Sequence, residues 1–214
     1  MTNLHLSEHN RNRCLWVVVL LFVIANALIW LGTDDLIRLK YAGDGESWYN
    51  PSVGLFEHGK FVNPDSPETP SVYRPPAFPV FAAAVFHLAG EPSPLVIAIA
   101  QIALLLMTGF LFRSMVNDWL PGRGDFGMAL LLFNPNVFSV AQFAQSDTLF
   151  LYFVTLAIWA LLRQSRRTNG WVYAPVVGAA IACATLTRPT AQFLIVVLPL
   201  AFPFLQQPLG HSRL

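Results

Sequence analysis

Long apolar runs without a charged residue alternate with short polar segments along most of the chain. A helix needs roughly 20 apolar residues, and about 17 at the least, to cross the hydrocarbon core of a bilayer. Runs close to this length occupy residues 14–33, 94–112, 126–144, 148–162, 169–187 and 189–210. The pattern therefore predicts an all-α polytopic membrane protein with about six transmembrane helices.

Two apolar runs are short for a membrane span. The run 148–162 can be extended to the membrane surface by Ser146 and by Arg163, whose long side chain reaches the interface. The run 77–89 covers only about four helical turns. It either crosses as a short tilted span or lies at the membrane surface, and the distribution of basic residues distinguishes the two arrangements.

Basic residues favour the cytoplasmic side of a membrane, and Arg11 and Arg13 before the first run place the N-terminus there. If 77–89 does not cross, the cytoplasmic side holds the larger basic group, which comprises Arg11, Arg13, Arg113, Arg123, Arg163, Arg166, Arg167 and Arg213. The outer side then holds the smaller group, which comprises Arg38, Lys40, Lys60, Arg74 and Arg188. A crossing would move most of the larger group outside. We therefore expect 77–89 to lie at the outer interface as an amphipathic or re-entrant helix.

The resulting organisation is a single membrane domain, 1–214, with both termini in the cytoplasm. The first span is 14–33, a long outer loop covers 34–91, and a five-helix bundle covers 94–210. One or two outer juxtamembrane helices are expected in this loop. Besides 77–89, residues 47–58 have apolar positions at helical spacing and end at Gly59. The stretch 63–79 is rich in proline, which predicts an extended conformation.

The composition supports the membrane class and excludes others. Hydrophobic residues make up 55% of the sequence and charged residues 12%, whereas soluble domains average ~25% charged residues. The formal net charge of +1 gives no general basic surface for nucleic acid. Cys14 and Cys183 are too few for a disulfide framework or a structural zinc site.

The outer loop contains the first candidate chemistry. Asp44 and Glu46 precede the short helix, and Tyr49 follows one turn later. Two carboxylates at this spacing could hold a metal or accept a proton from an attacking hydroxyl. Alternatively, acids at a helix start satisfy backbone N–H groups and the helix dipole. His58 stands beside the same acidic segment and is a further candidate for proton transfer or a metal.

Arginines and a second acid occupy three later breaks between apolar segments. Tyr73 and Arg74 precede a diproline, where the arginine either binds a phosphate in bidentate fashion or anchors the chain at the interface. Asp147 separates two apolar runs, as a functional intramembrane acid or as the polar residue of a tight turn. Arg188 lies in a similar break and could pair with a phosphate or with Asp147.

The chain resembles the GT-C glycosyltransferases, in particular the protein O-mannosyltransferase and aminoarabinose-transferase group. The resemblance rests on residues 43–61, which read GDGESWYNPSVGLFEHGKF, and on three later motifs in the same order. These motifs are YRPPAFP at 73–79, QSDT at 145–148 and LTRPT at 186–190. The similarity runs over most of residues 14–205.

The resemblance implies a membrane enzyme that moves a sugar from a polyprenyl-phosphate carrier to an acceptor on the outer face. It implies an essential acid at Asp44, catalytic base or metal-linked, with a divalent metal of unknown identity as the expected cofactor. Glu46 and the second acid Asp147 join the catalytic set. The expected substrate-binding residues are Tyr49, His58, Tyr73, Arg74 and Arg188.

The resemblance also sets expectations for partners and location. Family members usually continue with further helices, so we expect a truncated gene product, a fragment, or half of a split enzyme whose companion chain supplies the missing helices. The expected location is the bacterial inner membrane, with the lipid bilayer and an unknown acceptor as partners and no nucleic acid. A non-catalytic partner that binds lipid-linked sugars remains the alternative to an enzyme. A transporter subunit ranks last because no internal repeat is found.

Overall fold

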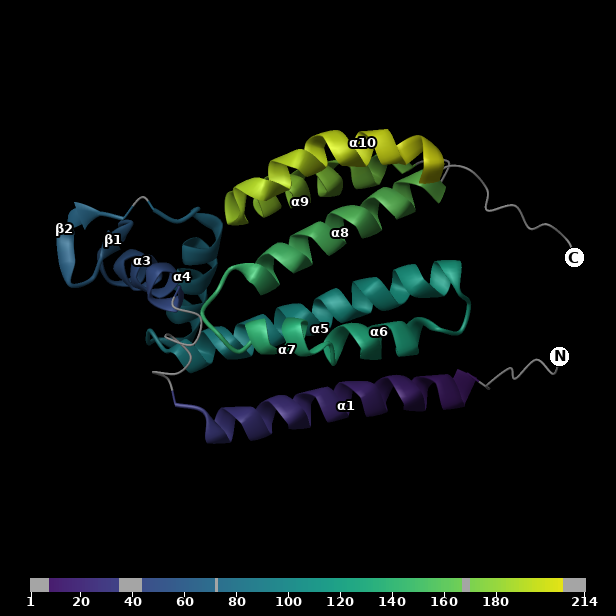
Figure 1. Cartoon of the computed structure of the whole chain (residues 1–214), viewed down its shortest axis with the longest axis horizontal. Helices are drawn as coiled ribbons and strands as arrows, with labels where there is room; N and C mark the ends of the chain where they lie inside the picture. Colours follow the sequence, from purple (N-terminus) through teal and green to yellow (C-terminus); the bar gives the residue numbers. More distant parts are fainter. Residues whose placement is uncertain (1–7, 35–43, 72, 167–169, 206–214) are drawn as a thin grey trace, which may run out of the picture.

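A computed structural model describes residues 8–34, 44–71, 73–166 and 170–205, and most of them are helical (Figure 1). The helices are α1 (Glu8–Gly32), α3 (Gly45–His58), α4 (Ala77–Ala89), α5 (Pro94–Trp119), α6 (Gly124–Leu132), α7 (Pro135–Val140), α8 (Asp147–Arg166), α9 (Ala174–Thr187) and α10 (Leu194–Leu205). The strands β1 (Val62–Asn63) and β2 (Ser66–Pro70) form a small antiparallel hairpin, and 3-10 turns at Gly170–Tyr173 and Pro189–Phe193 precede α9 and α10.

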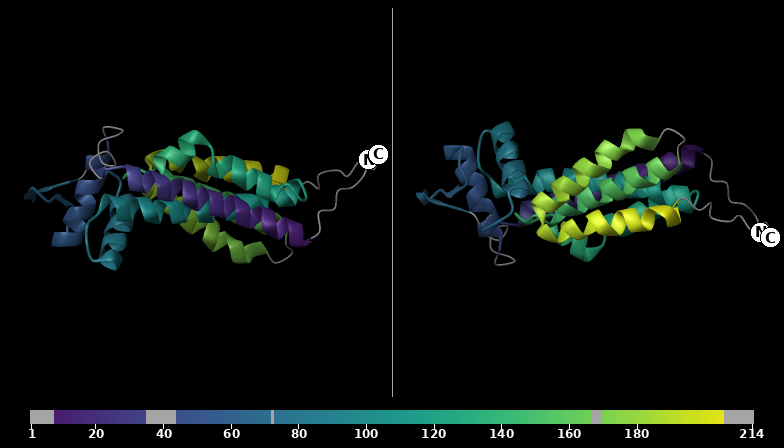
Figure 2. Two further views of the ribbon diagram at one scale, coloured as in Figure 1. Left: turned by 90° about the horizontal axis from the view of Figure 1, so that it is seen from below. Right: turned by 90° about the horizontal axis from the view of Figure 1, so that it is seen from above.

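The long helices run back and forth between two ends of the molecule (Figure 1). We call the end that holds α3, α4 and the hairpin the loop end, and the end where α1 begins and α10 finishes the terminal end. α5 leads from the loop end to the terminal end, α6 and α7 return, α8 leads away again, α9 returns, and α10 finishes at the terminal end. Figure 2 shows α3 and α4 set across the direction of the long helices.

Three of the described helices are long and apolar enough to cross a membrane, within Arg13–Gly32, Pro94–Trp119 and Asp147–Arg166. The other helices that lie along them, such as α9 and α10, are shorter and also apolar. Large apolar side chains on α1 and α10 are exposed, including Leu28 at 65% and Leu200 at 67%. Such an outward apolar surface suits contact with lipid tails, so the protein is an all-α membrane protein, as the sequence predicts.

The apolar run 126–144, read from the sequence as one span, is divided into α6 and α7. Pro135 has no backbone N–H to continue a helix, and the Asn134 side chain accepts hydrogen bonds from the N–H groups of Asn136 and Val137. Asn134 therefore caps the start of α7, while α6 has already ended at Leu132. The break is short enough for both segments to continue in one direction (Figure 1).

At the loop end, α3 and α4 pack on each other and on the starts of α5 and α8. Their shared core holds aromatic and aliphatic side chains, namely Trp48, Val53, Phe78, Ala82, Phe86, Ile97, Ala144 and Leu149. α3 begins at Gly45 and ends before Gly59, which adopts a positive φ of 65° that favours glycine. β1 crosses α3 closely at Gly54, where an added Cβ would come within 2.1 Å of the Val62 carbonyl oxygen.

The proline-rich stretch 63–79 is extended only in its first part. Residues 62–70 form the hairpin, but α4 already begins at Ala77 and contains Pro79 in its first turn. A proline is tolerated there because the first N–H groups of a helix have no partner within the helix. α4 then continues beside α3, and the expectation that 77–89 does not cross the membrane stays a prediction.

Candidate functional site

The first ion pair at the loop end joins the residue before α3 to the residue before the diproline. Arg74 Nη2 lies 2.8 Å from Asp44 Oδ1. Arg74 Nε–H donates to the Ser47 hydroxyl at 2.8 Å, and that hydroxyl donates to the Asp44 carbonyl oxygen at 2.6 Å. Two directed contacts thus fix the guanidinium plane against the start of α3.

Aromatic rings enclose the same guanidinium. The Cζ atom of Arg74 lies 4.7 Å from the centre of the Trp48 ring and 4.8 Å from that of the Tyr73 ring. Both contacts are in the range of cation–π attraction. As a result the Arg74 side chain is only 17% exposed, whereas that of Asp44 is 60% exposed. The Asp44 carboxylate is therefore exposed, and the more buried Arg74 holds it in position.

A second ion pair joins the start of α8 to the end of α9. Arg188 Nη2–H donates to Asp147 Oδ2 at 2.6 Å, and Arg188 Nε–H donates to the Ser146 hydroxyl at 3.1 Å. The pairing of Arg188 with Asp147, one of two options open from the sequence, is therefore confirmed. In this pair both side chains are partly exposed, that of Arg188 at 39% and that of Asp147 at 32%. This guanidinium is more accessible than that of Arg74.

An apolar groove of about 360 Å³ lies near the two ion pairs in the sequence, and we call it the loop-end groove. It lies between α4, α8 and α9 and is lined by Pro76, Ala77, Val80, Phe81, Leu149, Phe153, Cys183 and Leu186. Its lining begins at Pro76, two positions after Arg74, and includes Leu149 and Leu186, each two positions from Asp147 or Arg188. The helices that line the groove therefore begin or end close in sequence to Arg74, Asp147 and Arg188.

Buried amides hold the α7–α8 connection that carries Asp147. Gln142 donates to Asn26 Oδ1 and accepts from Trp30 Nε1–H at 3.0 Å, which ties the connection to α1. Gln101 of α5 donates to the carbonyls of Ala141 and Phe143. Gln101 and Gln142 were not predicted as site residues, because an isolated glutamine in an apolar run gives no signal of its partners.

The remaining predicted residues lie at different distances from these pairs. Glu46 is exposed in the first turn of α3 beside Asp44. The Tyr49 hydroxyl donates to the Pro92 carbonyl at 2.8 Å, which links α3 to the segment before α5. His58 is the last residue of α3, about 20 Å along the helix from Asp44, and lies 3.9 Å from Glu57. The structure does not bring His58 to the ion pairs, and its role stays a prediction.

The expected metal at Asp44 stays a prediction. Within the described ranges, no group of three or more histidine, cysteine, aspartate or glutamate residues is close enough to hold an ion. Asp44 already shares one carboxylate oxygen with the Arg74 guanidinium. The described residues therefore give no geometry for a metal, and we derive no step through one.

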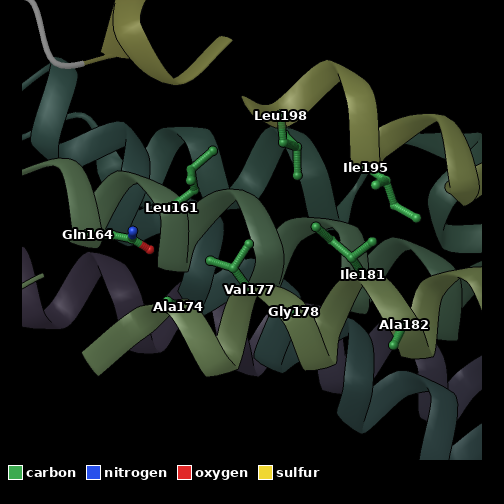
Figure 3. A pocket seen from close by; sticks show the side chains of 9 residues that line it. All are labelled: Leu161, Gln164, Ala174, Val177, Gly178, Ile181, Ala182, Ile195 and Leu198. Carbon is green, nitrogen blue, oxygen red and sulfur yellow. The ribbon is translucent and has the colours of Figure 1, made fainter. Parts of the chain in front are cut away.

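Another apolar groove, of about 540 Å³, lies between α8, α9 and α10 (Figure 3). Figure 3 shows aliphatic side chains such as Val177, Ile181 and Leu198 around it, with Gln164 as the polar side chain. None of its lining residues is charged. The loop-end groove is also lined by uncharged residues, but its helices begin or end close in sequence to Arg74, Asp147 and Arg188, so it is the candidate site.

Comparison with known protein families identifies the family of the chain. The family model described as dolichyl-phosphate-mannose-protein mannosyltransferase matches residues 73–211. The match covers most of the chain, and the protein belongs to this family of GT-C type membrane glycosyltransferases. It includes Tyr73, Arg74, Asp147 and Arg188, whereas Asp44 lies before it. No curated protein and no solved structure matches the chain significantly.

Proposed function

We propose that this chain catalyses transfer of a sugar from a polyprenyl-phosphate carrier to an acceptor hydroxyl at the loop end of the bundle. The observation that carries the proposal is that two carboxylate–guanidinium pairs include residues at the ends of the helices that line one apolar groove. A carrier lipid has the same division, with a negatively charged head and a long apolar tail. The groove would hold the part of the tail next to the phosphate, and the pairs would surround the head.

In the proposed reaction, Asp44 acts as the general base. The acceptor oxygen forms a bond to the anomeric carbon of the sugar while the bond from that carbon to the phosphate oxygen breaks. The bonding electrons leave with the polyprenyl phosphate, and the hydroxyl proton passes to a carboxylate oxygen of Asp44. The exposure of the Asp44 side chain, 60%, leaves room for an acceptor to approach.

The two arginines have different proposed roles because their surroundings differ. Arg74 is enclosed by aromatic rings and bonded to Ser47 and Asp44, so we assign it to orienting the base. Arg188 is 39% exposed and can share its guanidinium between Asp147 and a phosphate. It would stabilise the negative charge that grows on the departing phosphate. Asp147 keeps Arg188 in position between turnovers.

The charge distribution of the sequence supports a proposal for the side of the membrane that the site faces. The loop end would face the outside of a bacterial inner membrane, since the larger basic group belongs to the terminal end. Neither the sugar nor the acceptor is identified by the site. Mannose is the sugar in the family description and is the first to test.

The test compares Asp44→Asn with Asp65→Asn in membranes that contain the full chain. Asp65 is an exposed acid in the hairpin turn at the same end, so both substitutions remove one negative charge there. The probe is polyprenyl phosphate bearing radiolabelled mannose, and the readout is label that leaves the lipid fraction. We expect Asp44→Asn to lower transfer about 100- to 10,000-fold, as for loss of a general base, and Asp65→Asn to leave it unchanged.

Two results would contradict the proposal. Equal transfer by the Asp44→Asn and unmodified chains would remove Asp44 from the reaction. Binding of the labelled lipid without transfer by any variant, with every natural membrane acceptor present, would instead support the non-catalytic subunit that binds lipid-linked sugars. Protein level and membrane insertion are measured for each variant by quantitative immunoblotting, so that a change in transfer refers to the same amount of inserted protein.

A further inference from the structure

The terminal end contains a group of charges that the proposed transfer does not use. Asp118, near the end of α5, lies 3.3 Å from Arg163 Nη1 and 3.0 Å from Arg166 Nη1, both in the last turns of α8. We call these three residues the terminal-end cluster. Among the ion pairs that the structure describes, Asp118 is the carboxylate shared by two arginines. The cluster therefore keeps one positive charge in excess.

The cluster is ordered and remains accessible. Arg163 also donates from Nη2 to the Ser114 hydroxyl, and its Cζ lies 5.6 Å from the centre of the Trp159 ring. Arg166 has no such second support in the described contacts, and its side chain is 35% exposed. The structural role of the cluster, which is to join α5 to α8, is met by Arg163. Arg166 is thus the arginine most available to an outside anion.

An apolar groove of about 460 Å³ runs from this cluster toward the middle of the bundle. It lies between α5, α6 and α8 and is lined by Phe112, Met115, Val116, Trp119, Leu120, Leu131, Leu151, Val154, Thr155 and Ile158. Trp119 follows Asp118 directly, so the groove reaches the level of the cluster. On α8, Leu151, Thr155, Ile158 and Arg166 follow each other on one helical face, which places the arginine beyond the groove.

We propose that this groove and the terminal-end cluster bind one anionic phospholipid of the surrounding bilayer. The phosphate would contact Arg166 and, in part, Arg163, while an acyl chain would lie in the groove. The occupant follows from charge complementarity. An uncharged or zwitterionic lipid does not compensate the excess positive charge, and a soluble anion does not cover the apolar lining. The site lies at the opposite end of the bundle from the candidate transfer site and does not depend on the transfer chemistry.

The test is native mass spectrometry of the purified full chain, mixed with equal amounts of phosphatidylglycerol and phosphatidylcholine of identical acyl chains. The readout is the ratio of the two lipids retained by the protein. We expect a preference for phosphatidylglycerol that falls about fivefold in Arg166→Gln, the factor expected for one arginine near a membrane surface. Asp118 keeps Arg163 in this variant, so the fold loses no necessary ion pair.

Two further variants determine whether the effect belongs to this cluster. Arg123→Gln removes the same charge from the exposed turn between α5 and α6 at the same end, and should leave the ratio unchanged. Ile158→Trp narrows the groove without changing any charge, and should reduce retention of phosphatidylglycerol. Because Arg166→Gln keeps the core intact, the lipid ratio of this variant tests the proposal even if Ile158→Trp fails to fold.

Three results would overturn the proposal. Equal retention of both lipids by the unmodified chain would show that the excess charge attracts no anionic headgroup. An equal fall in Arg123→Gln and Arg166→Gln would show a diffuse basic field without a site. Displacement of phosphatidylglycerol by inorganic phosphate alone, at equal concentration, would show that the arginines bind a free anion and that the groove contributes nothing.

Discussion

The ion pairs at the two ends of the bundle differ in how far their carboxylates are covered. At the loop end, the side chains of Asp44 and Asp147 are 60% and 32% exposed. At the terminal end, those of Asp118 and Asp125 are 21% and 14% exposed, with Asp125 held by Arg113. Similar residue types therefore serve different purposes. The covered acids join helices, whereas the exposed acids can meet a substrate.

The positions of the grooves add to this difference. The helices that line the loop-end groove begin or end close in sequence to two separate ion pairs, each between a carboxylate and one arginine, whose charges balance before a substrate binds. The terminal-end groove is bordered by a cluster with one positive charge in excess. A balanced pair can exchange its partner during a reaction, while an excess charge favours lasting binding of an anion.

Among the proposed substitutions, replacing an aspartate by asparagine is expected to give the largest difference in transfer between the two ends. Asp147→Asn should lower transfer per inserted molecule about 100-fold, equal to about 2.7 kcal/mol, because Arg188 loses the carboxylate that positions it. Asp125→Asn should leave transfer per inserted molecule unchanged and lower thermal stability in detergent, since Arg113 loses a covered partner. Transfer assays and thermal unfolding of both variants measure the two quantities, and reversed results would remove the distinction between the ends.

A smaller effect is expected for the amides that hold the α7–α8 connection. Gln142→Leu leaves the buried Asn26 Oδ1 without its donor, which should cost about 1–3 kcal/mol of unfolding free energy. Gln145→Leu removes a neighbouring glutamine from the same connection and is the matched control, expected to cost less. Unfolding of both variants in mixed micelles gives the comparison. Equal stabilities would show that the link between α1 and this connection does not support the loop end.

The smallest effect is expected when an arginine is replaced by lysine. Arg188→Lys keeps the charge but loses the planar pair of donors that reaches both Ser146 and Asp147. Transfer should fall about tenfold, or about 1.4 kcal/mol. Arg113→Lys at the terminal end should change transfer by less than about twofold. An equal fall in both variants would mean that Arg188 has no special contact with the carrier phosphate.

The sequence predicted those features that depend on nearby residues. The apolar runs indicated the membrane class, and Gly59 marked the end of α3. Each of these signals is local, because a helix end or a membrane span depends on the residues within it. The division at Asn134 was missed, although Pro135 stood in the sequence as the residue that causes it.

Partners across long stretches of sequence were less predictable. The spacing around Asp44 permitted a metal, and only the packing of α3 against α4 shows that Arg74 lies beside this carboxylate. The pairing of Asp147 with Arg188 could be named in advance because both were isolated charges expected at the same face. Gln101 and Ser146 gave no such signal, since a short polar side chain acquires its role from the neighbours that folding brings to it.

Photocrosslinking of the full chain with a polyprenyl phosphate that carries a diazirine in its first isoprene unit tests the central claim most directly. Peptide mapping locates the attached lipid. Our account predicts attachment within the loop-end groove, at Pro76–Phe81 or at Leu149, Cys183 and Leu186, and loss of attachment in Arg188→Gln. Attachment at the groove of Figure 3, around Val177 and Ile195, that persists in Arg188→Gln would contradict it.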